Sequence, residues 1–133
     1  MSDATFSLSF RARHPSTTPP DLSAHVRLPL EIHWKAGDRK RTPTGTEVQG
    51  FRHESYWCFG MQPRENDLGA SVGQLLTDLT EDRGFFDKFV DSGGKLEVYV
   101  TYGPEQPGEL VAADLMRQLA SRNVDLAIDW ARS

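Results

Sequence analysis

The chain has 133 residues, of which 38% are hydrophobic and 26% are charged, and it contains one cysteine. This length suits one domain over residues 1–133, and a domain of this size buries roughly two-thirds of the surface that its unfolded chain exposes. An internal disulfide is excluded because Cys58 has no second cysteine. The sequence has no run of about 18 apolar residues and no signal-peptide pattern after Met1, so we expect a soluble cytoplasmic protein without a membrane segment.

Charge is distributed unevenly along the chain. Residues 1–64 carry nine Lys/Arg and six Asp/Glu, whereas residues 65–133 carry six Lys/Arg and thirteen Asp/Glu. If these halves form two faces of the fold, the protein would orient a charged partner rather than bind polyanions strongly. The alternative is that the charges interleave in three dimensions, and the sequence leaves both open.

Strict alternation of apolar and polar residues predicts a first strand over 5–13. Its inward set is expected to be Phe6, Leu8, Phe10 and Ala12. His14-Pro15 ends this strand, and Ser16–Asp21 carries the hydroxyl, proline and acidic residues of a helix start. We expect a short helix over 20–27, which ends before Leu28-Pro29 because proline disfavours the helical conformation of its predecessor.

The stretch from Trp34 to Phe59 holds two of the three tryptophans and the densest positive charge. Residues 28–35 alternate, and we expect an edge segment that delivers Trp34 to the core. Turn residues at 37–38 and 43–45 flank a basic cluster that should be exposed, Arg39-Lys40-Arg41. Asp38 is expected to accept backbone N–H bonds from the residues that follow it.

A second strand is predicted from Arg52 onward, with its bulkier apolar set facing the core. That set is Ser55, Trp57, Phe59 and Met61, and the opposite set is Tyr56, Cys58 and Gly60. After a polar loop over 62–69, the apolar spacing becomes helical at Val72, Leu75, Leu76 and Leu79. The stripe continues through Phe85, Phe86, Phe89 and Val90. We therefore expect one kinked helix or two short ones, closed by Ser92-Gly93-Gly94.

The remaining segments are a strand, a helix and a strand. Residues 95–102 predict a strand with Leu96, Val98 and Val100 facing inward. Residues 109–121 predict a helix with one apolar face, formed by Ala112, Leu115, Met116 and Leu119. The last strand alternates, with Val124, Leu126, Ile128 and Trp130 on one side.

Alternation in every strand indicates that one sheet face is solvated and that the helices cover the other. The expected order is strand, helix, strand, helix, strand, helix, strand. We predict an α/β (α+β) fold, a two-layer sandwich with a mixed or largely antiparallel sheet of about four to five strands and helices on one face.

Several short motifs resemble the family called domain of unknown function 4279, which consists of uncharacterised small bacterial proteins. They are Arg13-His14-Pro15, Trp34-Lys35-Ala36-Gly37-Asp38, Ser55-Tyr56-Trp57 and the terminal stretch 126–130. The similarity spans nearly the whole chain, and the positions carried over are Trp34, Gly37, Asp38 and Trp57. The family has no assigned activity. The resemblance implies a small stand-alone cytoplasmic protein and, by analogy with other small α/β proteins, an immunity protein that neutralises a toxin.

The sequence contains no catalytic or metal motif of high specificity. The spacing of Cys58 and the four histidines matches no zinc-finger, ribbon or metalloprotease pattern, so we predict no metal site. His53 and Cys58 are five residues apart and would point to opposite faces of a regular strand, which argues against a nucleophile pair. Asp125 and Asp129 would share the open face but lie about 13 Å apart along the strand. We predict no catalytic residues and no cofactor, and we favour a function other than catalysis.

Two functional hypotheses remain. In the first, a non-enzymatic protein binds a toxin or another acidic protein surface through the basic loop and the open sheet face. Its site would consist of Trp34, Lys35, Asp38, Arg39, Lys40, Arg41, Arg52, Tyr56, Arg11 and Tyr99. In the second, a pocket between Trp34, Trp57, Arg52 and Tyr56 binds a small molecule or acts as an enzyme.

A less favoured hypothesis is single-stranded RNA binding by Arg11, Arg13, Tyr56 and Tyr99, which would combine stacking with cations. The net charge of −4 opposes it. The basic loop also has a structural interpretation, as a solvated turn that fastens a long connection to the core. The sequence does not decide whether the protein is a monomer or a dimer.

Overall fold

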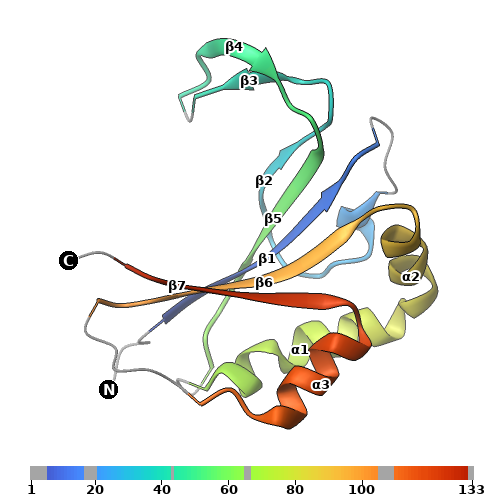
Figure 1. Ribbon diagram of the computed structural model, residues 1–133, viewed down its shortest axis with the longest axis vertical. Helices are drawn as coiled ribbons and strands as arrows, with labels where there is room; N and C mark the ends of the chain where they lie inside the picture. Colours follow the sequence, from blue (N-terminus) through green and yellow to red (C-terminus); the bar gives the residue numbers. More distant parts are fainter. Residues whose placement is uncertain (1–5, 17–20, 43, 65–66, 105–109, 132–133) are drawn as a thin grey trace.

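The computed structural model describes residues 6–16, 21–42, 44–64, 67–104 and 110–131 (Figure 1). Its strands are β1 (Phe6–His14), β2 (Leu30–Trp34), β3 (Arg39–Arg41), β4 (Glu47–Phe51), β5 (Ser55–Met61), β6 (Lys95–Tyr102) and β7 (Val124–Trp130). Its helices are α1 (Leu68–Glu81), α2 (Arg83–Asp91), α3 (Ala113–Ser121) and a single 3₁₀ turn, η1 (Leu22–Ala24).

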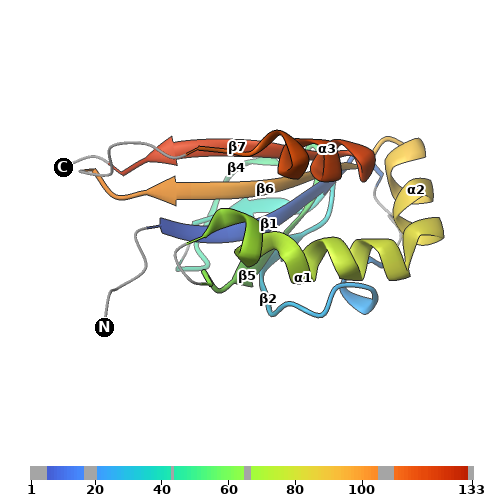
Figure 2. The same cartoon turned by 90° about the horizontal axis from the view of Figure 1, so that it is seen from below.

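Five strands form one mixed sheet in the order β2-β5-β1-β6-β7. All neighbours are antiparallel except β6 and β7, which are parallel. Helices α1, α2 and α3 lie on one face of this sheet (Figures 1 and 2). The predicted fold class is therefore confirmed, with α3 as the crossover that joins the two parallel strands.

The core lies between β1, β5 and β6 and the helices. The inward residues predicted for β1 and β6 are all buried, and Phe10, Leu96, Val98 and Val100 have no exposed surface. The helical stripe is also buried except at Phe85 and Val90, which are partly buried, and it is divided between α1 and α2, which meet at Asp82. Of the two alternatives for this segment, the pair of short helices is therefore correct.

A second sheet was not predicted. Strands β3 and β4 form a two-stranded hairpin, here called the arm, which projects from the body beyond β2 and β5 (Figure 1). Arg39 pairs with Phe51 and Arg41 with Glu47, and the connecting loop turns at Gly45, whose φ of 89° is one that glycine adopts readily. The basic cluster thus forms a strand rather than a loop, because its backbone finds a partner six to twelve residues downstream.

Three other predictions need correction. The helix expected over 20–27 is only the turn Leu22–Ala24, and residues 17–20 lie outside the described part of the chain. On α3 only Leu115 and Leu119 are buried, whereas Met116 is 49% exposed. The end of β7 is exposed as well, because the helices cover only its beginning.

The end of α2 depends on a glycine. The backbone N–H of Gly94 donates to the carbonyl oxygen of Phe89, the terminal bond of the predicted helix cap. A Cβ at position 94 would overlap the ring and the carbonyl oxygen of Phe89, which has no exposed surface. This position therefore accepts no side chain without displacement of a core residue.

Gly94→Ala should therefore lower the free energy of unfolding by about 2 kcal/mol or more, as overpacking does. The matched control is Gly73→Ala on the exposed side of α1, where an added Cβ meets no atom within 4 Å beyond the neighbouring backbone of its own helix. It should raise the free energy of unfolding by about 0.5–1 kcal/mol, because alanine favours helix. Urea denaturation of both variants measures the difference, and equal values for the two would contradict this role of Gly94.

His14 is a buried titratable group at the end of β1. Its Nδ1 accepts the backbone N–H of Ser16 at 3.1 Å and its Nε2 lies 2.9 Å from the hydroxyl oxygen of Ser92. This arrangement places the single proton of the neutral ring on Nε2. Burial lowers the pKa of His14 from its ordinary value of 6.5.

The unfolded protein therefore binds a proton at His14 more readily than the folded protein. The free energy of unfolding should fall as the pH drops below about 6.5 and should level off below the folded pKa. His14→Gln should flatten this dependence in urea denaturation across that range, whereas the exposed His53 changed to Gln should leave it intact. An unchanged slope in His14→Gln would show that another group causes the effect.

Candidate functional site

The helix-free face of the sheet carries arginines that contact aromatic rings, here called the cation–aromatic row (Arg52, Trp34, Tyr56, Arg13, Arg11 and Tyr99). The guanidinium carbon of Arg52 lies 3.8 Å from the ring centroid of Trp34, whose ring stacks at 4.5 Å on Tyr56. Arg13 lies 5.4 Å from the ring of Tyr56. The guanidinium of Arg11 lies 3.9 Å from the ring of Tyr99.

These contacts cover the face that has no helices. Arg13 forms ion pairs with Glu54 at 3.4 Å and Glu97 at 3.7 Å. Tyr99 donates its hydroxyl to Asp129 at 3.0 Å, and this bond raises the pKa of Tyr99. Burial likewise raises the pKa of Tyr56. The rings are therefore already engaged, which disfavours the hypothesis that RNA bases stack on them.

Trp34 differs from its prediction. It is only half-buried and lies on the helix-free face, where it is part of the row. Trp57 lies on the opposite face, 2% exposed, against the core residue Phe89. The two tryptophans therefore do not line one pocket, and the pocket predicted between Trp34, Trp57, Arg52 and Tyr56 is wrong in that form.

A tight turn joins β2 to the arm. The carboxylate of Asp38 accepts the backbone N–H of Lys35 at 2.9 Å. The prediction that the donor follows Asp38 in the sequence is therefore wrong, because Lys35 precedes it. The backbone of Asp38 accepts the N–H of Arg52 at 2.7 Å, and the N–H of Gly37 donates to the carbonyl oxygen of Arg52 at 2.8 Å. These bonds clamp the two chain segments at the base of the arm and fix Arg52 beside Trp34.

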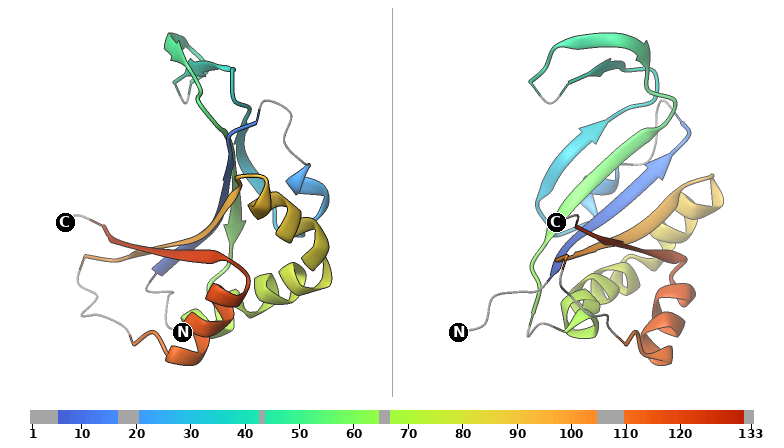
Figure 3. Two further views of the ribbon diagram at one scale, coloured as in Figure 1. Left: turned by 45° about the vertical axis from the view of Figure 1, so that its right-hand side comes forward. Right: turned by 60° about the vertical axis from the view of Figure 1, so that its left-hand side comes forward.

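An open groove of about 950 Å³ lies between β2 and the arm. The arm and its base contribute Asp38, Arg39, Arg41, Thr42 and Arg52, and β2 contributes Glu31, Ile32, His33 and Trp34. Successive residues of β2 point to opposite faces of the sheet. Because residues of both faces line the groove, the groove follows the free edge of this strand. Figure 3 shows the arm bending over this end of the sheet.

The groove arginines differ in their pairing. Arg39 and Arg41 both contact Glu47, at 3.2 and 3.1 Å. Arg52 has no carboxylate of the described residues within 4.0 Å and is held by its stacking on Trp34. Its N–H groups are therefore oriented but not paired with a carboxylate of the described residues.

Five of the predicted partner-binding residues meet at this groove: Trp34, Asp38, Arg39, Arg41 and Arg52. Lys35 and Lys40 do not line it, and the side chain of Lys40 lies across β4 near Gly50. Arg11 and Tyr99 belong to the far part of the row, and Tyr56 supports Trp34. The sequence correctly predicted an edge segment over residues 28–35 but missed the contribution of Ile32 and His33, because alternation does not show which distant segment lies beside a strand edge.

The described residues contain no group of three or more His, Cys, Asp or Glu side chains arranged to hold a metal ion. None of the helices in the described ranges combines the length and apolar character needed to cross a membrane. Comparison with protein-family models, curated proteins and solved structures found no match. The resemblance to domain of unknown function 4279 accordingly stays a prediction.

The stacking of Arg52 on Trp34 should be measurable by a double-mutant cycle with Arg52→Met and Trp34→Leu. We expect a coupling free energy of about 0.5–1 kcal/mol in urea denaturation followed by circular dichroism. Arg39 and Phe51, whose guanidinium carbon and ring centroid are 5.8 Å apart on the exposed arm, are the matched control pair. Their coupling should be smaller, and a coupling of zero for Arg52 and Trp34 would refute the assignment.

Proposed function

We propose that this chain is a non-enzymatic binding protein that holds an acidic segment of a partner protein in the groove between β2 and the arm. The observation that carries this proposal is Arg52. Its guanidinium lines the groove, stacks on Trp34 and has no ion pair within the described residues. A planar guanidinium with free N–H groups binds a carboxylate in bidentate fashion.

The surroundings of Arg52 favour a carboxylate ligand. Stacking restricts its side chain before binding, so less conformational entropy is lost when a ligand is bound. Arg39 and Arg41 already share the carboxylate of Glu47, which supports a carboxylate as the ligand of the neighbouring Arg52. Asp38 also lines the groove, but its carboxylate is bonded to the backbone of Lys35.

The shape of the groove favours an extended segment over an enclosed small molecule. It follows the edge of β2 and is open to solvent, whereas small-molecule sites enclose most of the ligand surface. Ile32, 47% exposed, gives the groove an apolar contact beside the arginines. We therefore propose a partner segment in which acidic residues alternate with uncharged ones.

The identity of the partner is a separate part of the proposal. The family resemblance suggests a toxin that this chain would neutralise, with the cytoplasm as the place of binding. A buried thiol at Cys58 without a disulfide partner fits that reducing compartment.

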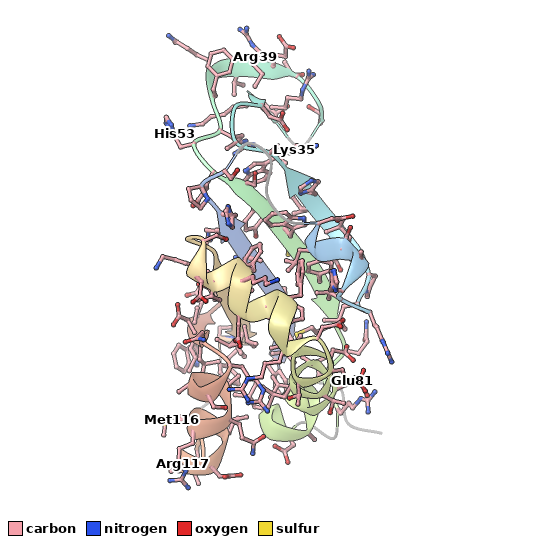
Figure 4. The ribbon with its side chains drawn as sticks, turned by 90° about the vertical axis from the view of Figure 1, so that its right-hand side faces the viewer. Lys35, Arg39, His53, Glu81, Met116 and Arg117 are labelled. Carbon is pink, nitrogen blue, oxygen red and sulfur yellow. The ribbon has the colours of Figure 1, made fainter. Side chains whose placement is uncertain are left out.

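The proposal predicts that a labelled peptide of alternating Glu and Thr binds the wild-type protein, with an affinity that falls as salt is raised. Arg52→Glu should weaken binding at least about tenfold, which corresponds to about 1.4 kcal/mol. Arg117→Glu is the matched control, because it makes the same charge change at the opposite end of the molecule (Figure 4). It should change the affinity less than about twofold. Fluorescence anisotropy measures all three proteins.

Two further probes separate the alternatives. A Lys/Thr peptide of the same length should not bind, and a single-stranded oligonucleotide should bind more weakly than the acidic peptide. If Arg52→Glu and Arg117→Glu weakened the affinity for the acidic peptide equally, the attraction would be nonspecific and the groove would be refuted as the site. Tighter binding of the oligonucleotide would overturn the proposal in favour of nucleic acid.

A further inference from the structure

The two edges of the sheet are constructed differently. At one edge, β2 has a register shift between Leu30 and Ile32, follows Pro29, and lies beneath the arm. Irregularity, proline and covering segments are the usual means by which proteins prevent strand addition. At the other edge, β7 pairs with β6 in unbroken register over all seven residues, from Val124 to Trp130. Among the described residues, this edge has no register shift and no proline, and no further strand pairs with it.

The free edge is also apolar where the helices do not reach. On the helix side of β7, Val124 is buried, but Ile128 is 40% and Trp130 is 46% exposed. Met116 of α3, 49% exposed, lies on the side of that helix that faces away from α1 (Figure 4). Because α3 lies beside β7 and α1 lies under β1 and β5, that side faces the free edge (Figure 2).

We propose that two copies of this chain pair through β7 in antiparallel fashion, which would join their sheets into one of ten strands. An isologous pair needs an edge that complements itself. With the two-fold axis at Ile128, this residue lies opposite its own copy, and Leu126 lies opposite Trp130 of the second copy on both sides of the axis. The exposed apolar row of one copy therefore meets the same row of the other.

Charge selects this register over its neighbour. With the axis at Ile128, Asp129 lies opposite Ala127, and Asp125 lies opposite Ala131. With the axis at Ala127, Asp125 would lie opposite Asp129 twice, and like charges directly opposite each other destabilise a strand pair. An axis at Leu126 would place Ile128 opposite Val124, which is already buried within its own copy.

The positions of the helices agree with this arrangement. Helix α3 lies under the beginning of β7, so a two-fold axis at Ile128 places the two α3 helices at opposite ends of the strand pair. The helices do not compete for the same space, and Trp130 of each copy approaches the end of the sheet where the second copy exposes Met116. A second copy fits this edge better than an unrelated strand, because the apolar residues of the edge are complementary to the same residues of the second copy.

The oligomeric state of the full chain tests this inference. Sedimentation equilibrium should show a dimer at about 10–100 μM, and Ile128→Lys should raise the dissociation constant at least about tenfold by opposing two ammonium groups. Ile32→Lys, the same change at the comparably exposed isoleucine of the other edge, should leave the dimer intact. A wild-type monomer throughout this range, or a dimer that only Ile32→Lys disrupts, would overturn the proposal.

Cysteine cross-linking tests the register. In a Cys58→Ala background, Ile128→Cys should form an intermolecular disulfide, because directly opposite Cα atoms are about 4.5–5.5 Å apart and disulfides accept this distance. Ala127→Cys should not, because its Cα and that of its copy would be about 8 Å apart. Cross-linking of Ala127→Cys in place of Ile128→Cys would refute the stated axis.

Discussion

Stacking between guanidinium groups and aromatic rings on the helix-free face is the interaction on which the rest of this structure depends. A five-stranded sheet with helices on one face leaves the other face to water, yet β5 is buried on both sides, including Cys58 and Tyr56. The cation–aromatic row provides that cover. Arg and Tyr side chains have long apolar parts that shield the sheet while their polar ends reach solvent and acidic partners.

The row also connects the body of the protein to its arm. Arg52 follows β4, and its backbone is bonded to Gly37 and Asp38 at the start of β3. Its side chain stacks on Trp34 of β2, which stacks in turn on Tyr56. The groove is therefore formed on an element that is anchored at its base, and the arginine that lines it is held by a rigid ring. Such preorganisation is what a binding site needs to lose little entropy when it is occupied.

The two edges of the sheet differ, and this difference limits how copies of the chain can assemble. The edge at β2 is irregular and lies beneath the arm, so its exposed side chains belong to the groove. The edge at β7 is regular and carries the apolar residues that the helix layer does not cover. A protein with one protected and one unprotected edge can form a closed pair but not an open series, because head-to-tail addition would require both edges.

Local pattern was sufficient for much of the fold. Alternation in β1 and β6 and the spacing of Val72, Leu75 and Leu79 marked their buried sides correctly, because the period of side chains along a strand or helix depends only on the backbone. The sequence also indicated that Trp34, Asp38 and the arginines of residues 39–52 form one region. Only the tertiary structure decided that Arg39–Arg41 forms a strand, that Trp34 and Trp57 lie on opposite faces, and that Ile128 and Trp130 stay exposed. These outcomes depend on which distant segment lies beside each residue, and the local spacing of apolar residues contains no information about distant neighbours.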